Sequence, residues 1–398
     1  MLERSPHTSQ RATESQDHIM HSRATHQTRR LVFLDQIKAI MIALVIATHT
    51  ILVGTLFSTD LKQIIESAPN YEAISFWFGW ICNTFYMNIL FLISGYLVPS
   101  SVHKRGVANY ARQRILRLGI PLILATFLLN NITPLAGLLI PNSNVFGQGF
   151  NDLPLNRIGP QWFILVLIIL NIIYCFWVFI RKKQFTIDNS KSVPGWRSWL
   201  ISAAVLGTLE VIMGYFSGHW AGLKDSSLDG LGYQGMHLWT YVFLFFIGCK
   251  AASHQWLERI NKQFAFSWLR LSLLITLALL ASNYVALIPR HNKTSWEFIS
   301  PLMAFLTPLI GWGFIAAVLT WSQAHEQLDS HWLIKAGKDS FGAYLIHIPL
   351  LAGAMVTFYS LGIKNIWILG LGSTIMAIFL SFIASHQLRK IQAIRQII

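Results

Sequence analysis

Long apolar stretches separated by short polar segments fill the chain from residue 31 onward. A helix needs about 20 mainly apolar residues to cross the hydrocarbon core of a membrane, because that core is about 30 Å thick and each residue adds about 1.5 Å. Ten stretches meet this requirement, at 32–57, 75–98, 118–140, 161–180, 198–216, 237–253, 268–288, 299–321, 340–360 and 364–385. The pattern predicts an all-α integral membrane protein, a bundle of about ten transmembrane helices.

The position of the charges agrees with this prediction. Only 12% of the residues are charged, against roughly a quarter in soluble domains. Basic residues gather in every second loop, as expected for loops on the cytoplasmic side. Because the helix number is even, both termini are predicted to lie in the cytoplasm. The protein is expected in the inner (plasma) membrane, in contact with membrane lipids. These loops account for the net charge of +14, so we expect no nucleic-acid partner.

The two ends of the chain differ from the apolar part. Residues 1–30 are polar and contain no apolar run, so they are predicted to be a disordered cytoplasmic tail rather than a cleaved signal. Residues 31–388 form the predicted membrane domain, and 389–398 a short basic cytoplasmic tail. The three cysteines stand singly in apolar segments without a metal-binding spacing, so we expect neither a metal site nor a disulfide.

Ionisable residues in the first apolar segment are the first candidates for chemistry, since such groups need a reason to lie in a membrane. Asp35 and Lys38 are three residues apart and can pair on one helix face. His49 lies about 16 Å further along nearly the same face. A neutral imidazole can take a proton from a hydroxyl and return it to a leaving thiolate. An interfacial ion pair and a histidine that binds a neighbouring helix explain these residues without chemistry.

The next two segments contribute basic and small residues. Arg114 and Arg117 are three residues apart at the mouth of the third segment, where two guanidinium groups can hold phosphate oxygens. The rule that places basic residues on the cytoplasmic side explains them without a ligand. Ser94 and Gly95 interrupt the second segment, and such small residues commonly serve helix packing.

Aromatic and polar residues of later segments are candidates for a binding site. Trp162 and Trp239 open the fourth and sixth segments, where they fit either an interfacial aromatic belt or a surface on which a sugar stacks. Tyr344 and His347 are three residues apart in the ninth segment and therefore neighbours on one helix face. Core packing explains them equally well, and Asp339 before them fits a solvated helix start.

Six stretches, taken in order, resemble the signatures of the membrane acyltransferase-3 family. They are LDQIKAIMIALVIATH, FLISGYLV, RQRILRLGIP, GPQWFILVLI, HLWTYVFLFFIG and SFGAYLIHIPLL. The resemblance covers the chain from Leu31 to the last helix. It implies a helical bundle that takes acyl groups from cytoplasmic acyl-coenzyme A (acyl-CoA) and places them on extracytoplasmic sugars, lipids or peptidoglycan.

The resemblance also implies roles for individual residues. His49 matches the catalytic histidine of the family, with Asp35 as an organiser of the helix. Lys38 stands where the family has an arginine, and with the matching Arg114 and Arg117 it would bind the donor. Ser94, with Gly95 after it, matches a small-residue turn of the family. Tyr344 and His347 match a later tyrosine and histidine, and all three side chains are expected to bind the acceptor or line the cavity.

The sequence therefore predicts an O-acyltransferase that moves an acetyl, succinyl or similar group onto a hydroxyl of an envelope glycan or glycolipid. Acyl-CoA is the expected cosubstrate, and no permanently bound cofactor is expected. A transporter or flippase of an envelope glycan or lipid is the alternative, because it too would hold polar residues on interior helix faces.

Overall fold

The computed structural model describes residues 32–50, 53, 59–129, 132, 159–182, 185–216, 237–286, 294–325, 331–395 and 397. The predicted tail of residues 1–30 lies outside these ranges. Within them the chain forms helices and turns without a strand. The long helices and the shorter ones that join them are the first helix (Val32–Thr50), α2 (Thr59–Glu66), α3 (Pro69–Asn83), α4 (Tyr86–Arg105), α5 (Val107–Leu124), α7 (Trp162–Arg181), α8 (Trp196–Phe216), α9 (Leu238–His254), α10 (Lys262–Ala286), α11 (Thr294–Ala324), α12 (His331–Ser360), α13 (Ile366–Leu388) and α14 (Gln392–Arg395).

Eight helices of the described part are long and apolar enough to cross a membrane. They confirm an all-α, multi-pass membrane protein, although they do not reach the predicted ten. The predicted third and sixth spans are the two that are missing from this set. The helix at the sixth, α9, has 17 residues, and the helix at the third, α5, contains several arginines. The count of about ten therefore stays a prediction.

Helix α5 begins earlier than the apolar pattern indicates. The third span was predicted from residue 118, whereas the helix starts at Val107. Arg114 and Arg117 consequently lie within a helix and not at its mouth. Arginine is a good helix former, so a basic segment beside a membrane can be helical although a search for apolar residues does not find it. Gly106 separates α4 from α5 with a φ of 77°, a conformation that glycine adopts without strain.

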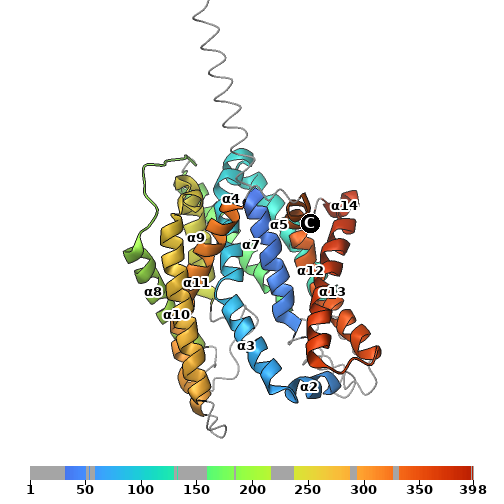
Figure 1. Cartoon of the computed structure of the whole chain (residues 1–398). Coiled ribbons are helices and arrows are strands. Elements are labelled where there is room, and N and C mark those ends of the chain that lie inside the picture. The colour runs from blue at the N-terminus through green and yellow to red at the C-terminus, as the bar shows by residue number, and fades with distance from the viewer. Residues whose placement is uncertain are drawn as a thin grey trace, which may run out of the picture.

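The bundle has two sides with α4 and α7 between them (Figure 1). Helices α8, α10 and α11 lie on one side, and α12 and α13 lie beside each other on the opposite side. The first helix begins at the end of the bundle where α13 finishes, at the top of Figure 1. We call this end the basic end, after Arg105, Arg114, Arg117 and Arg389.

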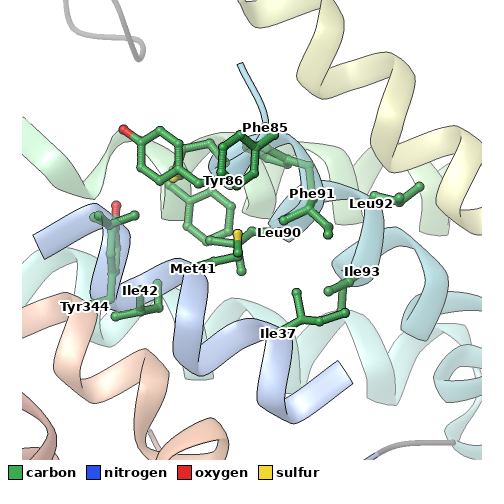
Figure 2. Close-up of a cluster of buried hydrophobic side chains, with 14 of the residues drawn as sticks. Ile37, Met41, Ile42, Phe85, Tyr86, Leu90, Phe91, Leu92, Ile93 and Tyr344 are labelled. Atoms are coloured by element: carbon green, nitrogen blue, oxygen red, sulfur yellow. The ribbon is translucent and has the colours of Figure 1, made fainter. Parts of the chain in front are cut away.

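Helices α4 and α9 approach each other closely through two glycines. A Cβ on Gly95 would lie 2.0 Å from the carbonyl oxygen of Phe245, and one on Gly248 would lie 2.2 Å from that of Leu92. Only glycine permits such backbone contact, which is a common way for membrane helices to pack. Apolar side chains of α4 and the first helix, such as Phe91 and Met41, fill the core beside this crossing (Figure 2).

Candidate active site

His49 lies near the end of the first helix, and its imidazole is oriented by its own backbone. The Nδ1 atom is 2.7 Å from the carbonyl oxygen of Val45. Because a carbonyl oxygen can only accept a hydrogen bond, Nδ1 carries the proton and donates it. In a neutral ring the Nε2 atom is then an acceptor, which is the state that a general base requires. The side chain is half-buried.

A second imidazole lies against the first. The rings of His49 and His347 are 5.0 Å apart and meet edge to face. Nδ1 of the fully buried His347 lies 2.5 Å from the carbonyl oxygen of Tyr344 on the same helix, so its Nε2 atom is also left as an acceptor. This Nε2 has no hydrogen-bond partner among the described residues. We call His49 and His347 the histidine pair.

Tyr344 joins the histidine pair to the start of α7. Its ring stacks on His347 with centroids 5.7 Å apart, so the two residues lie side by side as their spacing predicted. Its hydroxyl donates a hydrogen bond to the carbonyl oxygen of Pro160. Pro160 belongs to the short helical turn Gly159–Gln161, which leads into α7. Helix α12 is thereby held to α7 beside the pair.

Two further tyrosines continue from Tyr344 towards α9. The ring of Phe163 lies 5.8 Å from that of Tyr344 and 4.8 Å from that of Phe91. Figure 2 shows the hydroxyl oxygens of Tyr86 and Tyr344 on the same side of the apolar cluster. The ring of Tyr241 stacks on Phe91 at 4.8 Å and on Trp162 at 5.2 Å. A row of aromatic residues thus crosses the bundle from α12 to α9.

This row ends at a buried carboxylate that the sequence interpretation missed. Glu210 of α8 is fully buried, and one of its carboxylate oxygens lies 2.9 Å from Nδ1 of His237, which is 1% exposed. The other oxygen accepts a hydrogen bond of 2.5 Å from the hydroxyl of Thr240. A carboxylate inside an apolar segment is costly and therefore marks a functional candidate. We call Glu210, His237 and Thr240 the Glu210 cluster.

Arg114 is held in place at the basic end by a chain of buried polar groups. Its Nε atom donates to the hydroxyl of Tyr110 at 3.0 Å. That hydroxyl donates to the side-chain oxygen of Asn171 at 2.5 Å, and the Asn171 amide donates to the carbonyl oxygen of Leu167. Because Nε is used in this chain, the outer nitrogens of the Arg114 guanidinium are the ones that can meet a ligand.

Arg114 is one of four arginines that lie close together. Burial lowers the pKa of Arg117, and the positive charges of Arg114, Arg105 and Arg389 lower it further. Guanidinium groups nevertheless stay charged in proteins. A group of like charges favours an anion that bridges them, and guanidinium groups match phosphate oxygens in geometry. The two arginines proposed from sequence therefore lie close together on α5. Arg389, which directly follows α13, lies near them and is paired with Asp339.

Asp35 and Lys38 form an ion pair of 2.6 Å in the first helix, as their spacing predicted. Both are partly exposed, and helix α12 touches this point, since a Cβ on Gly337 would lie 2.3 Å from the Asp35 carbonyl oxygen. Asp35 is about 20 Å along the helix from His49. It therefore makes no contact with that imidazole, which is oriented by Val45 instead.

Asp339 differs from the solvated helix start that the sequence favours. Its side chain is 4% exposed and accepts a hydrogen bond of 2.6 Å from Arg389. His386 lies 3.0 Å from its other carboxylate oxygen. His386 lies on α13 and Arg389 directly follows that helix, so they are 47 and 50 residues from Asp339 in the sequence. Such contacts between distant segments leave no local pattern, so the sequence did not reveal them.

The remaining candidates separate into packed and exposed residues. Ser94 is half-buried in α4, next to the Gly95 contact with α9. Trp162 is half-buried and stacks on Tyr241 inside the bundle. Trp239, by contrast, is 46% exposed, which fits the aromatic belt better than a site.

No group of three or more His, Cys, Asp or Glu side chains that could hold a metal ion occurs among the described residues. The cysteines Cys82, Cys175 and Cys249 are buried and unbonded to one another. The candidate site therefore consists of the histidine pair, the aromatic row with the Glu210 cluster, and the arginines of the basic end.

Fold and site together define a multi-pass helical membrane protein with a pair of acceptor nitrogens inside the bundle and clustered arginines at one end. The family model described as "Acyltransferase domain" matches residues 31–386. The chain therefore belongs to this acyltransferase-3 family, and these residues form its acyltransferase domain.

One curated relative points to the same family. The chain is similar to glucans biosynthesis protein C of Escherichia coli (strain SMS-3-5 / SECEC), with 26% identity over 172 residues. The match covers 41% of this chain and 42% of that protein, so it spans less than half of the relative. No solved structure matches the chain.

Proposed function

We propose that this protein transfers an acyl group from acyl-CoA to a hydroxyl of an extracytoplasmic carbohydrate or glycolipid. The observation that carries the proposal is the orientation of His49, whose Nδ1–H is used by Val45 so that Nε2 accepts a proton. The acyltransferase family supports the reaction type. The similar protein from Escherichia coli is named for glucan biosynthesis, which supports a carbohydrate as the acceptor.

The donor enters from the basic end, which we place at the cytoplasmic face of the inner membrane with both chain termini. Arg114 and Arg117, helped by Lys38, hold the phosphate groups of coenzyme A there by charge-assisted hydrogen bonds. Lys38 and His49 are about 16 Å apart along the first helix. The long pantetheine arm of the donor spans this distance and brings the thioester to the histidine pair.

The acyl transfer needs one proton acceptor that later becomes a proton donor. Nε2 of His49 takes the proton of the acceptor hydroxyl, and the hydroxyl oxygen forms a bond to the thioester carbonyl carbon. The bond between that carbon and sulfur then breaks. The leaving thiolate takes the proton back from the imidazolium, so the products are an ester and free coenzyme A. His347 lies against His49 and accepts a second hydrogen bond from the acceptor.

The test is the substitution His49→Ala, measured as release of free coenzyme A thiol by purified protein and as ester content of envelope glycans by mass spectrometry. We expect the variant to reach the membrane normally and to lose both signals, since removal of a general base typically lowers the rate by 10²–10⁴-fold. Retention of the ester would refute the role of His49.

His325→Ala is the matched control. Nδ1 of His325 lies 2.9 Å from the carbonyl oxygen four residues earlier, as in His49, but the side chain is exposed. This variant should keep wild-type activity. If the wild-type protein itself released no thiol from acyl-CoA in the presence of acceptor, the transporter or flippase alternative would replace the proposal.

A further inference from the structure

Several buried side-chain atoms lack a hydrogen-bond partner among the described residues, and two of them lie on the aromatic row beside the histidine pair. One is Nε2 of His347, and the other is the hydroxyl of Tyr241, whose side chain is 1% exposed. A buried polar group without a partner destabilises the fold, because it has lost its hydrogen bonds to water and gained none in return. Phenylalanine at position 241 would remove that cost and keep the stacking on Phe91 and Trp162. The hydroxyl is therefore better explained by a ligand than by packing.

The two atoms have complementary needs. Nε2 of His347 can only accept a hydrogen bond while its Nδ1–H is donated to Tyr344, whereas the hydroxyl of Tyr241 can donate one. The rings of Phe163 and Phe91 lie between them: Phe163 is 5.8 Å from the Tyr344 ring and 4.8 Å from Phe91, which in turn is 4.8 Å from the Tyr241 ring. One hydroxyl group cannot reach both ends of such a row, but a molecule with several hydroxyls can.

The surroundings of Tyr241 also suit a carbohydrate. The ring of His237 lies 6.1 Å from that of Tyr241, and its Nδ1 atom is 2.9 Å from the Glu210 carboxylate. A carboxylate with two oxygens has about four acceptor positions, of which Thr240 and His237 occupy one each. Hydroxyls of a sugar donate readily to the remaining positions. A monohydric lipid alcohol would leave this end of the row unused.

We propose that Tyr241 and the Glu210 cluster form an acceptor-positioning subsite for a polyhydroxylated acceptor. It binds one hydroxyl of the acceptor while another lies at the histidine pair and is acylated. The subsite rests on the function proposed above and deepens it, because it assigns the acceptor side of the reaction to α8 and α9. The hydroxyl of Tyr241 contacts the acceptor, and the carboxylate of Glu210 orients the acceptor by accepting hydrogen bonds from its hydroxyls.

The first experiment measures binding without the reaction. A β-linked glucose oligosaccharide is titrated into purified protein by calorimetry, in a detergent that has no sugar headgroup. We expect Tyr241→Phe to weaken binding about tenfold, which corresponds to about 1.4 kcal/mol. Tyr215→Phe removes the same atom from a 52% exposed side chain on α8 and should bind as the wild type does. Absence of binding to the wild type, or an equal Kd in Tyr241→Phe, overturns the subsite.

The second experiment separates binding from structural damage. With acetyl-CoA or succinyl-CoA as donor, Tyr241→Phe should raise the KM for the oligosaccharide about tenfold and leave the KM for the donor unchanged. A purely structural role would lower the amount of active protein and hence kcat without moving either KM. Glu210→Gln should raise the same acceptor KM. An unchanged acceptor KM in both variants refutes the subsite alone, whereas a wild-type protein that releases no thiol from acyl-CoA in the presence of acceptor refutes the proposed function.

Discussion

The crossing of α4 and α9 predicts how strongly an added methyl group destabilises the protein, because the contact distances there are known. In Gly95→Ala the new Cβ would lie 2.0 Å from the Phe245 carbonyl oxygen, whereas ordinary contact begins at 3.4 Å, so the helices must separate by about 1.4 Å. Overpacking of this kind costs about 1–3 kcal/mol. The better helix propensity of alanine returns about 0.5–1 kcal/mol. We expect a net loss of about 1–2 kcal/mol and a lower Tm.

A thiol-reactive fluorophore suits the measurement, because all three cysteines are buried and react only as the protein unfolds. Gly353→Ala is the matched control, since a Cβ there meets no atom within 4 Å, and it should melt at or above the wild-type temperature. Gly248→Ala enters the same crossing, so combining it with Gly95→Ala should cost less than the two single effects together. A Gly95→Ala variant that melts like the Gly353→Ala control would refute the close approach.

Two further predictions concern the basic end. Asp339→Asn should destabilise the protein by about 3 kcal/mol, because it leaves the charge of Arg389 without its buried partner. Adding Arg389→Met should recover part of the lost Tm, and a further fall in Tm would contradict the pairing. Arg114→Ala combined with Arg117→Ala should raise the KM for acyl-CoA at least tenfold, since charge-assisted hydrogen bonds contribute about 1.5–3 kcal/mol each. Arg112→Ala on the exposed side of the same helix should leave that KM unchanged, and equal effects would exclude a specific donor site.

Much of the fold could be predicted because membrane spans are encoded by local composition. Helices α7, α8 and α13 begin and end within a few residues of the apolar segments that predicted them. Helix α5 was placed poorly for the same reason. Its first three turns carry Arg112, Arg114 and Arg117, and an apolar pattern cannot separate a basic helix from a basic loop.

The candidate site was predictable only where its residues share a helix. The spacing of three residues between Tyr344 and His347 predicted their contact, and the same spacing between Asp35 and Lys38 predicted their ion pair. The contact of His49 with His347 joins residues on two distant helices and follows from tertiary packing alone. Glu210 was missed although a signal was present, since it is an acidic residue within a predicted span.

Each imidazole of the proposed site takes its orientation from a carbonyl oxygen of its own helix, His49 from Val45 and His347 from Tyr344. The tautomer that acyl transfer needs is consequently specified within one turn of helix and requires no partner on α8 or α9. Substitutions on those two helices can alter the fit of an acceptor while the base stays in its reactive form. One scaffold can in this way diversify its substrates during evolution without rebuilding its chemistry.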